Sequence, residues 1–302
     1  MPVVSKAGVQ IEYADEGRGR PVVLIHSSVS GNRQWRALSE ELRERYRVLA
    51  VNLYGYGETT PWPRAEPQPL SAQAELILAV CDELGEPVQL VGHSFGGSVA
   101  LKAALLLDGR CDGLVLLEPN PFHLLKQGGR TGAWLETVGL REDVESRIAS
   151  DDWLGAAERF ADYWLGDGAW SAMPERRRDA FADALAPNVH EWQAVMDERT
   201  AIEGYAAVGA RTLVVSDPAT RRPIREIVEL LAVGCPEWSF RSLPEGGHMA
   251  PLTRPELVNP IVREFLNGVT AQSAAGRRRS ASAGGSVRRA PRPCRPPRAS
   301  GS

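Results

Sequence analysis

Gly92-His93-Ser94-Phe95-Gly96-Gly97 is the stretch of this 302-residue sequence that decides its fold. It follows the short apolar run Val88–Val91 and precedes Ser98–Leu107, which is rich in the helix formers Ala and Leu. This order predicts a strand, an abrupt turn and a helix, with glycines on the turn that let the strand and the helix pass closely. Ser94 lies on the turn, and the free N–H groups that begin the helix would stabilise negative charge there. The stretch therefore predicts a nucleophilic serine.

Apolar runs on both sides of this turn alternate with helical patterns. Runs without a polar face are typical of strands buried on both faces of a parallel sheet, so we predict an α/β fold with a mostly parallel sheet flanked by helices. The predicted strands are Val9–Ala14, Pro21–Ile25, Arg47–Val51, Val88–Val91, Gly113–Leu117, Arg211–Val215 and the edge strand Trp238–Leu243. The predicted helices, besides the one after Ser94, are Arg33–Tyr46, Leu70–Leu84, Ile224–Ala232 and Pro255–Leu266.

The pattern changes between residues 120 and 208, where short helical periods and many aromatic residues replace the strands. We expect a helical cap at 120–208, inserted between a first part of the core at 1–119 and a second part at 209–267. Residues 268–302 consist mainly of Arg, Ser, Ala, Gly and Pro, and this composition predicts a disordered tail. The tail has either no role or a role as a tether to an anionic surface.

The composition excludes several classes of protein. No run of about 18 apolar residues predicts a membrane span. Without the eight arginines of the tail the net charge is about −11, which argues against nucleic-acid binding by the folded body. The cysteines are too scattered to predict disulfides or a zinc site: Cys81, Cys111, Cys235 and Cys294. Because a signal-peptide pattern is also missing, we expect a cytoplasmic protein. The oligomeric state is left open.

A serine hydroxyl needs a base to become a nucleophile. His248 follows two glycines in a loop after the last predicted strand, and those glycines would let the loop fold back over the carboxyl edge of the sheet. The chain order of serine, acid and histidine required by a strand–turn–helix serine also places the base late in the chain. We therefore predict His248 as the base. We expect His93 to point away from the turn and His26 to brace a loop.

These pieces together resemble the α/β-hydrolase superfamily of serine hydrolases, esterases and cofactor-free haloperoxidase-like enzymes. The matching motifs are His26-Ser27-Ser28 after its strand, Gly55-Tyr56-Gly57, the six residues around Ser94, and Gly246-Gly247-His248-Met249-Ala250. They occur in the family's order and span about Ile11 to Leu266. The resemblance implies the α/β-hydrolase fold with its inserted cap.

The resemblance also implies an oxyanion hole made by two backbone N–H groups. One donor would be Phe95, directly after the nucleophile. The other would be Ser28, because family members usually carry His-Gly-X in this loop and the X residue donates. Ser27 replaces the glycine of that motif, and its hydroxyl could add a contact.

The acid that would orient His248 has two candidates. Most similar enzymes carry it after the strand equivalent to Arg211–Val215, where this chain has Asp217 but where the usual position falls near Thr220. A minority carry it one strand earlier, where Glu118 follows the strand Gly113–Leu117. Its role would be to fix the tautomer of His248 and to stabilise the imidazolium. We favour Glu118 and retain Asp217.

The predicted function is that of a serine hydrolase that cleaves an ester-like bond of a small, partly apolar substrate through an acyl-enzyme. No metal or organic cofactor is implied, and the expected partner is a small-molecule substrate, not a nucleic acid or a membrane. Serine instead of aspartate at the turn argues against haloalkane dehalogenase or epoxide hydrolase chemistry. The alternatives are a C–C bond hydrolase or lyase on the same fold, and a non-catalytic ligand-binding homologue.

Overall fold

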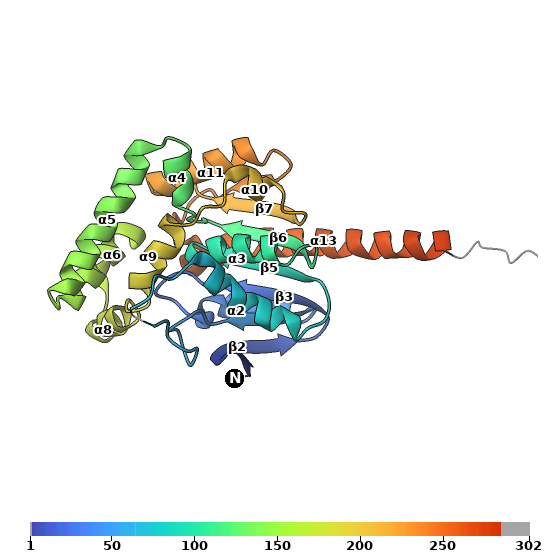
Figure 1. The fold of residues 1–302 in the computed structure, drawn as a ribbon, viewed down its shortest axis with the longest axis horizontal. Helices are drawn as coiled ribbons and strands as arrows, with labels where there is room; N and C mark the ends of the chain where they lie inside the picture. The colour runs from blue at the N-terminus through green and yellow to red at the C-terminus, as the bar shows by residue number, and fades with distance from the viewer. Residues whose placement is uncertain (1, 64, 285–302) are drawn as a thin grey trace, which may run out of the picture.

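The computed structural model of the protein describes residues 2–63 and 65–284. Among these residues the strands are β1 (Val3–Lys6), β2 (Val9–Gly17), β3 (Arg20–Ile25), β4 (Tyr46–Val51), β5 (Val88–His93), β6 (Cys111–Leu117), β7 (Arg211–Ser216) and β8 (Ser239–Ser242). They form one sheet in the order β1-β2-β4-β3-β5-β6-β7-β8 (Figure 1). Neighbours from β4 to β8 are parallel, whereas β1 and β2 add an antiparallel edge. This arrangement confirms the predicted mostly parallel α/β sheet.

The helices of the core cover both faces of the sheet (Figure 1). They are η1 (Asn32–Trp35), α1 (Arg36–Leu42), α2 (Leu70–Asp82), α3 (Phe95–Leu106), α11 (Arg222–Gly234), α12 (Ala250–Thr253) and α13 (Pro255–Gly284). On one face α2, α3 and α11 contribute to a large apolar core. On the other face a second core is formed with side chains of α1 and α13.

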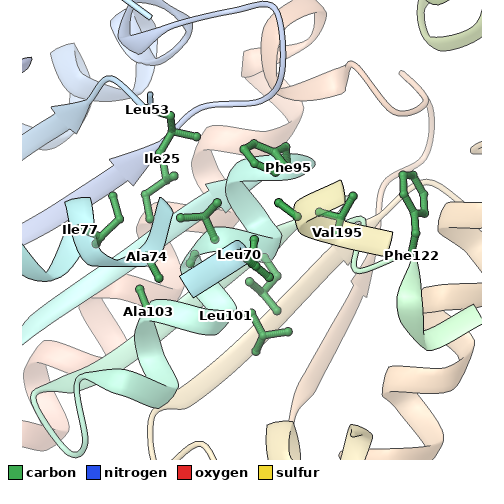
Figure 2. Packing of buried hydrophobic residues seen from close by; sticks show 14 of the residues in the cluster. Ile25, Leu53, Leu70, Ala74, Ile77, Phe95, Leu101, Ala103, Phe122 and Val195 are labelled. Atoms are coloured by element: carbon green, nitrogen blue, oxygen red, sulfur yellow. The ribbon is translucent and has the colours of Figure 1, made fainter. Parts of the chain in front are cut away.

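Successive side chains of the strands enter these two cores alternately. In β6, Leu114 and Leu116 belong to the core with α2 and α3, whereas Val115 and Leu117 belong to the core with α1 and α13. Figure 2 shows part of the first core, with labelled side chains that include Ile25, Leu70, Ile77, Phe95 and Leu101. The unbroken apolar runs in the sequence thus arise because both faces of the central strands are buried.

β1 is the strand that the sequence analysis did not predict. It is only four residues long and its side chains are mostly exposed, so it has little apolar pattern. Its pairing with β2 depends on a tight turn in which Ala7 and Gly8 both have positive φ angles, 52° and 83°. A two-residue turn of this kind fixes the register of a hairpin without a buried face.

Between β6 and β7 the described chain forms helices joined by short loops, without a strand. The helices are α4 (His123–Gln127), α5 (Thr131–Ala149), α6 (Trp153–Leu165), α7 (Ala169–Ala172), α8 (Glu175–Asp183), α9 (Asn188–Met196) and α10 (Ile202–Ala206). Figure 1 shows α5, α6, α8 and α9 together at one end of the sheet. Aromatic side chains hold them together, since the Phe160 ring packs against the rings of Trp164, Phe181 and Trp192. We refer to α4–α10 as the cap.

The C-terminal segment differs from the prediction. α13 does not end near Leu266 but continues to Gly284, so the expected disorder is wrong for residues 268–284. Val269 is buried, Thr270 accepts a hydrogen bond from Gln89 Nε2 at 3.0 Å, and Ser273 donates one to Asp112 at 3.2 Å. Ala, Gln and Arg are good helix formers, and a helix that has already started extends at little cost. The rest of the predicted tail, 285–302, lies outside the described residues.

No helix in the described part of the chain combines the length and the apolarity that crossing a bilayer requires.

Candidate active site

Ser94 lies on a sharp turn between the end of β5 and the start of α3. Its φ angle is 52° and its ψ angle −118°, a backbone conformation that side-chain-bearing residues rarely adopt. The flanking glycines make the turn possible, because a Cβ on Gly92 would collide with the carbonyl of Gly96, and one on Gly96 with the carbonyls of Ile25 and His26. The motif therefore does what its spacing predicts: it lets β3, β5 and α3 approach one another beneath the serine.

His248 is brought to Ser94 from the other end of the chain. Its Nε2 lies 2.9 Å from Ser94 Oγ, and both side chains are buried. The loop that carries it turns at Gly246 and Gly247, whose φ angles are 113° and 59°. The N–H of Gly247 donates to Asp217 Oδ2 at 2.8 Å and so ties the loop to the end of β7. The predicted serine and base are thus in hydrogen-bonding contact.

Glu118 stands directly after β6, with a positive φ angle of 48°. Its Oε2 lies 3.4 Å from His248 Nδ1. The carboxylate is 1% exposed and is held by two short hydrogen bonds, from the N–H of Asp217 to Oε1 and from Thr220 Oγ1 to Oε2, both 2.6 Å. Glu118 is therefore placed and oriented to act on the histidine.

Asp217, the other candidate acid, makes no hydrogen bond to His248 among the described residues. Its carboxylate accepts the N–H groups of Ala219 at 2.7 Å and of Gly247 at 2.8 Å. Its geometry is that of a residue that holds loop backbone. Thr220, near which the sequence predicted the usual acid position to fall, donates to Glu118 Oε2. No role was predicted for Thr220, although the expected acid position fell near it.

Ser28 and Phe95, the two predicted oxyanion donors, both lie beside the cavity. Phe95 begins α3 and Ser28 lies in the loop after β3, and both line the cavity that contains Ser94 and His248. Within the described residues neither N–H group donates to a protein acceptor. Two free amides beside a nucleophile can bind an oxyanion without first breaking an internal hydrogen bond.

Ser27 takes part in a hydrogen-bonded chain that the sequence analysis missed. Its N–H and its hydroxyl both donate to Gln34 Oε1, at 3.0 and 2.9 Å. Gln34 Nε2 donates to His93 Nδ1 at 3.1 Å, and His93 Nε2 donates to the carbonyl of His248 at 2.8 Å. The chain joins the loop of Ser28 to the loop of the base. No motif marks Gln34, and its partner His93 is 59 residues away in the sequence.

Burial keeps two histidines of this region neutral. It lowers the pKa of His93 from 6.5 to about 3, with a smaller contribution from His248, and that of His26 to about 4. His93 contacts the backbone of His248, not Ser94, as expected for a residue that points away from the turn. His26 accepts the N–H of Leu53 at 3.1 Å and braces that loop.

The cavity beside Ser94 has a volume of about 410 Å³. Its apolar lining comes mostly from the cap and includes Phe122, Phe160, Trp164, Leu165, Phe181, Trp192 and Val195. The ring of Trp164 also packs on the ring of His248, with centroids 4.3 Å apart. Several cap aromatics therefore line a pocket instead of serving only as core.

Glu191 of α9 also lines the cavity and was not predicted. It is 1% exposed, and burial raises the pKa of its carboxyl, while hydrogen bonds from Ser28, Asn188 and Tyr56 oppose that change. A glutamate in a helical pattern is usually solvated, so the sequence carried no signal for this position. Among the described residues no cluster of three His, Cys, Asp or Glu side chains could hold a metal ion.

Comparison with known proteins places these features in context. A model of the alpha/beta hydrolase family matches residues 22–261. The chain is 29% identical to lipase LipV of Mycobacterium tuberculosis over 279 residues, which cover 84% of this chain and 95% of that protein. It is 33% identical to 2-hydroxy-6-oxo-2,4-heptadienoate hydrolase of Pseudomonas putida over 214 residues, 67% of this chain and 77% of that protein. A hydrolase structure from Pseudomonas aeruginosa superposes with a TM-score of 0.72 at 21% identity, covering 88% and 97% of the two chains.

Proposed function

Because the chain belongs to the alpha/beta hydrolase family, we propose that it is a serine hydrolase that cleaves an ester-like bond of a small, partly apolar substrate through an acyl-enzyme. The observation that carries the proposal is the contact of 2.9 Å between Ser94 Oγ and His248 Nε2, with Glu118 on the other nitrogen of the imidazole. A nucleophile, a base and an acid that orients the base are the groups that acyl transfer requires.

In the acylation step Ser94 Oγ attacks the carbonyl carbon of the substrate while His248 Nε2 takes the hydroxyl proton. The carbonyl oxygen becomes an oxyanion, which the N–H groups of Ser28 and Phe95 bind. Glu118 stabilises the imidazolium that forms. When the tetrahedral intermediate collapses, the bond to the leaving alcohol breaks and His248 returns the proton to that alcohol.

In the deacylation step a water molecule replaces the alcohol. His248 removes a proton from this water, whose oxygen attacks the acyl carbon, and Ser94 leaves with the proton from His248. The apolar lining supplied by the cap favours a small acyl or alcohol group with little charge. The volume of about 410 Å³ is at the lower end of the usual range for ligand pockets.

A fluorophosphonate probe tests this proposal directly, since it labels only serines that a neighbouring base has activated. We expect labelling of the native protein and its complete loss in Ser94→Ala. Ser98→Ala is the matched control, because Ser98 lies one turn further along α3 and donates to Asn120, away from His248. Native, folded protein that takes no label would contradict the proposal and favour a non-catalytic binding protein.

Hydrolysis of a C–C bond is a second candidate, favoured by the 33% identity to 2-hydroxy-6-oxo-2,4-heptadienoate hydrolase. The same serine and base would serve both reactions. Turnover of a 2-hydroxy-6-oxo-2,4-dienoate, compared with turnover of p-nitrophenyl acetate by the same preparation, separates the two. Efficient cleavage of the dienoate with negligible ester turnover would replace the ester proposal with this one.

A further inference from the structure

The loop that carries Ser28 has a strained residue at its next position. Val29 has a φ angle of 60°, in the left-handed region that β-branched residues avoid. A conformation of this kind is strained and persists only where its surroundings hold it. Because Val29 follows Ser28 directly, whatever holds Val29 also restricts the loop segment that carries the Ser28 N–H.

Tyr56 is the group that holds Val29. Its hydroxyl accepts the N–H of Val29 at 2.9 Å and donates its single proton to Glu191 Oε1 at 2.8 Å. The tyrosine ring is buried and packs edge-on against His26, with centroids 4.6 Å apart. The hydroxyl is therefore fixed from both sides and has no other orientation that serves both partners.

Glu191, on α9 of the cap, ends the hydrogen-bonded series Val29–Tyr56–Glu191, which we call the relay. Its second oxygen accepts Asn188 Nδ2 at 3.0 Å, and the Ser28 side chain lies within hydrogen-bonding reach of the carboxyl. Among the described residues Glu191 forms no ion pair, so its partners are neutral donors. A buried carboxyl without a counter-ion is costly unless its hydrogen bonds are used. Here the hydrogen bonds of the Glu191 carboxyl connect α9 to the Ser28 loop.

We propose that Tyr56 and Glu191 are positioning residues for the oxyanion hole, through which the cap holds the Ser28 N–H at the angle that catalysis needs. This inference rests on the proposed serine-hydrolase function. It assigns the cap a part in the rate of the reaction, in addition to its contact with substrate. The relay acts on one of the two oxyanion donors, because Phe95 is fixed independently by the start of α3.

The test compares an ester with its thionoester, in which sulfur replaces the carbonyl oxygen. Sulfur is larger and a weaker acceptor, so a misplaced oxyanion donor harms the ester more than the thionoester. For Tyr56→Phe we expect kcat on p-nitrophenyl acetate to fall by about 10- to 100-fold with KM changed less than about threefold. The ratio of ester to thionoester kcat/KM should fall by at least about fivefold.

Tyr163→Phe is the matched control. Tyr163 donates to Glu136 at 2.6 Å, which is a tyrosine–glutamate pair within the cap, and among the described residues the Tyr163 hydroxyl makes no hydrogen bond to the Ser28 loop. We expect the control to retain both the native kcat and the native ratio. Equal losses on ester and thionoester in Tyr56→Phe, or no loss at all, would overturn the inference. A native protein inactive on both substrates would instead overturn the proposed function.

Two further variants test whether a loss of activity in Tyr56→Phe comes from the oxyanion hole or from a general loss of folding. Glu191→Gln keeps an oxygen for Tyr56, and Asn188 Oδ1, which has no partner, could turn to meet the new amide group. We expect it to retain more activity than Tyr56→Phe. In Val29→Gly the φ angle of 60° is free of strain, so loss of the Tyr56 hydroxyl should cost several-fold less in that background. An unchanged cost would show that the relay does not hold the strained loop.

Discussion

The two walls of the cavity are built in different ways. On the sheet side, Ser94, Glu118 and His248 stand on loops at strand ends, and the backbone at or just before each has a positive φ angle. On the cap side, the lining residues project from the regular helices α6, α8 and α9 and pack ring against ring. Strained loops fix atoms to within a fraction of an ångström, whereas helix faces tolerate exchange of side chains. The sheet wall therefore suits chemistry, whereas the aromatic side chains of the cap wall suit selection of substrate.

The largest effect that would sharpen this comparison concerns the acid on the sheet wall. Glu118→Gln removes the charge that stabilises the imidazolium of His248, and we expect kcat on p-nitrophenyl acetate to fall by about 10²- to 10⁴-fold. Asp217→Asn keeps an oxygen for one of its two backbone partners and should lose less than about tenfold. Near-native turnover in Glu118→Gln, with collapse in Asp217→Asn, would transfer the role of acid to Asp217.

Removal of the end of α13 should damage the sheet without reaching the cavity. A chain that stops after Leu266 loses buried Val269 and the hydrogen bonds made by Asn267, Thr270 and Ser273. We expect the free energy of unfolding to fall by about 2–4 kcal/mol, seen as a lower Tm, with unchanged preference among esters. A chain that stops after Gly284 keeps these contacts and is the control. A change of ester preference would contradict the separation of the two regions.

The aromatic side chains of the cap wall should change substrate preference and leave the chemistry alone. Phe181 of α8 lines the cavity and is only partly buried, so Phe181→Ala enlarges the cavity without emptying the core. We expect kcat/KM for p-nitrophenyl octanoate to rise about tenfold relative to the acetate, with kcat for the acetate nearly constant. Phe265→Ala, on the opposite face of the sheet, is the control and should lower stability only. Equal losses on both esters would show that Phe181 supports the sheet wall instead.

The same division explains what the sequence could predict. The apolar runs identified the central strands because both of their faces are buried, and the spacing of Gly92, Ser94 and Gly96 identified the turn because close approach demands glycine there. The roles of Gln34 and Glu191 were not predicted, since these residues contact partners that are 59 and 135 residues away in the chain. Local patterns carry information about backbone geometry, but they carry none about which distant polar atoms will meet.

The choice between Glu118 and Asp217 could be predicted only in part from the sequence. Both follow a strand at the same edge of the sheet, so position alone kept both as candidates. In the structure the Asp217 carboxylate accepts the N–H groups of Ala219 and Gly247, and this geometry favours Glu118 as the acid. The full length of α13 was not predicted for another reason. Its last turns have few apolar residues, and its contacts to Gln89 and Asp112 are polar.

The smallest expected effect concerns the neutral histidine inside the sheet wall. Burial lowers the pKa of His93 from 6.5 to about 3. The folded protein therefore binds fewer protons here than the unfolded chain, so acid favours unfolding, and the free energy of unfolding falls as the pH drops from 6.5 towards 3. From about pH 6 to about pH 5 this one group should account for about 1 kcal/mol of that fall.

His93→Gln tests this on the sheet wall with little change of contacts, because the amide nitrogen can still donate to the carbonyl of His248 and the amide oxygen can accept from Gln34. Urea unfolding at the two pH values should show a slope shallower than the native one by about 1 kcal/mol per pH unit. His26→Gln is the companion, since the pKa of His26 is lowered to about 4 and its removal should flatten the slope in the same direction. If His93→Gln keeps the native slope, then His93 is protonated in the folded protein, and the hydrogen-bonded chain from Ser27 to His248 is held by a charged group instead of a neutral one.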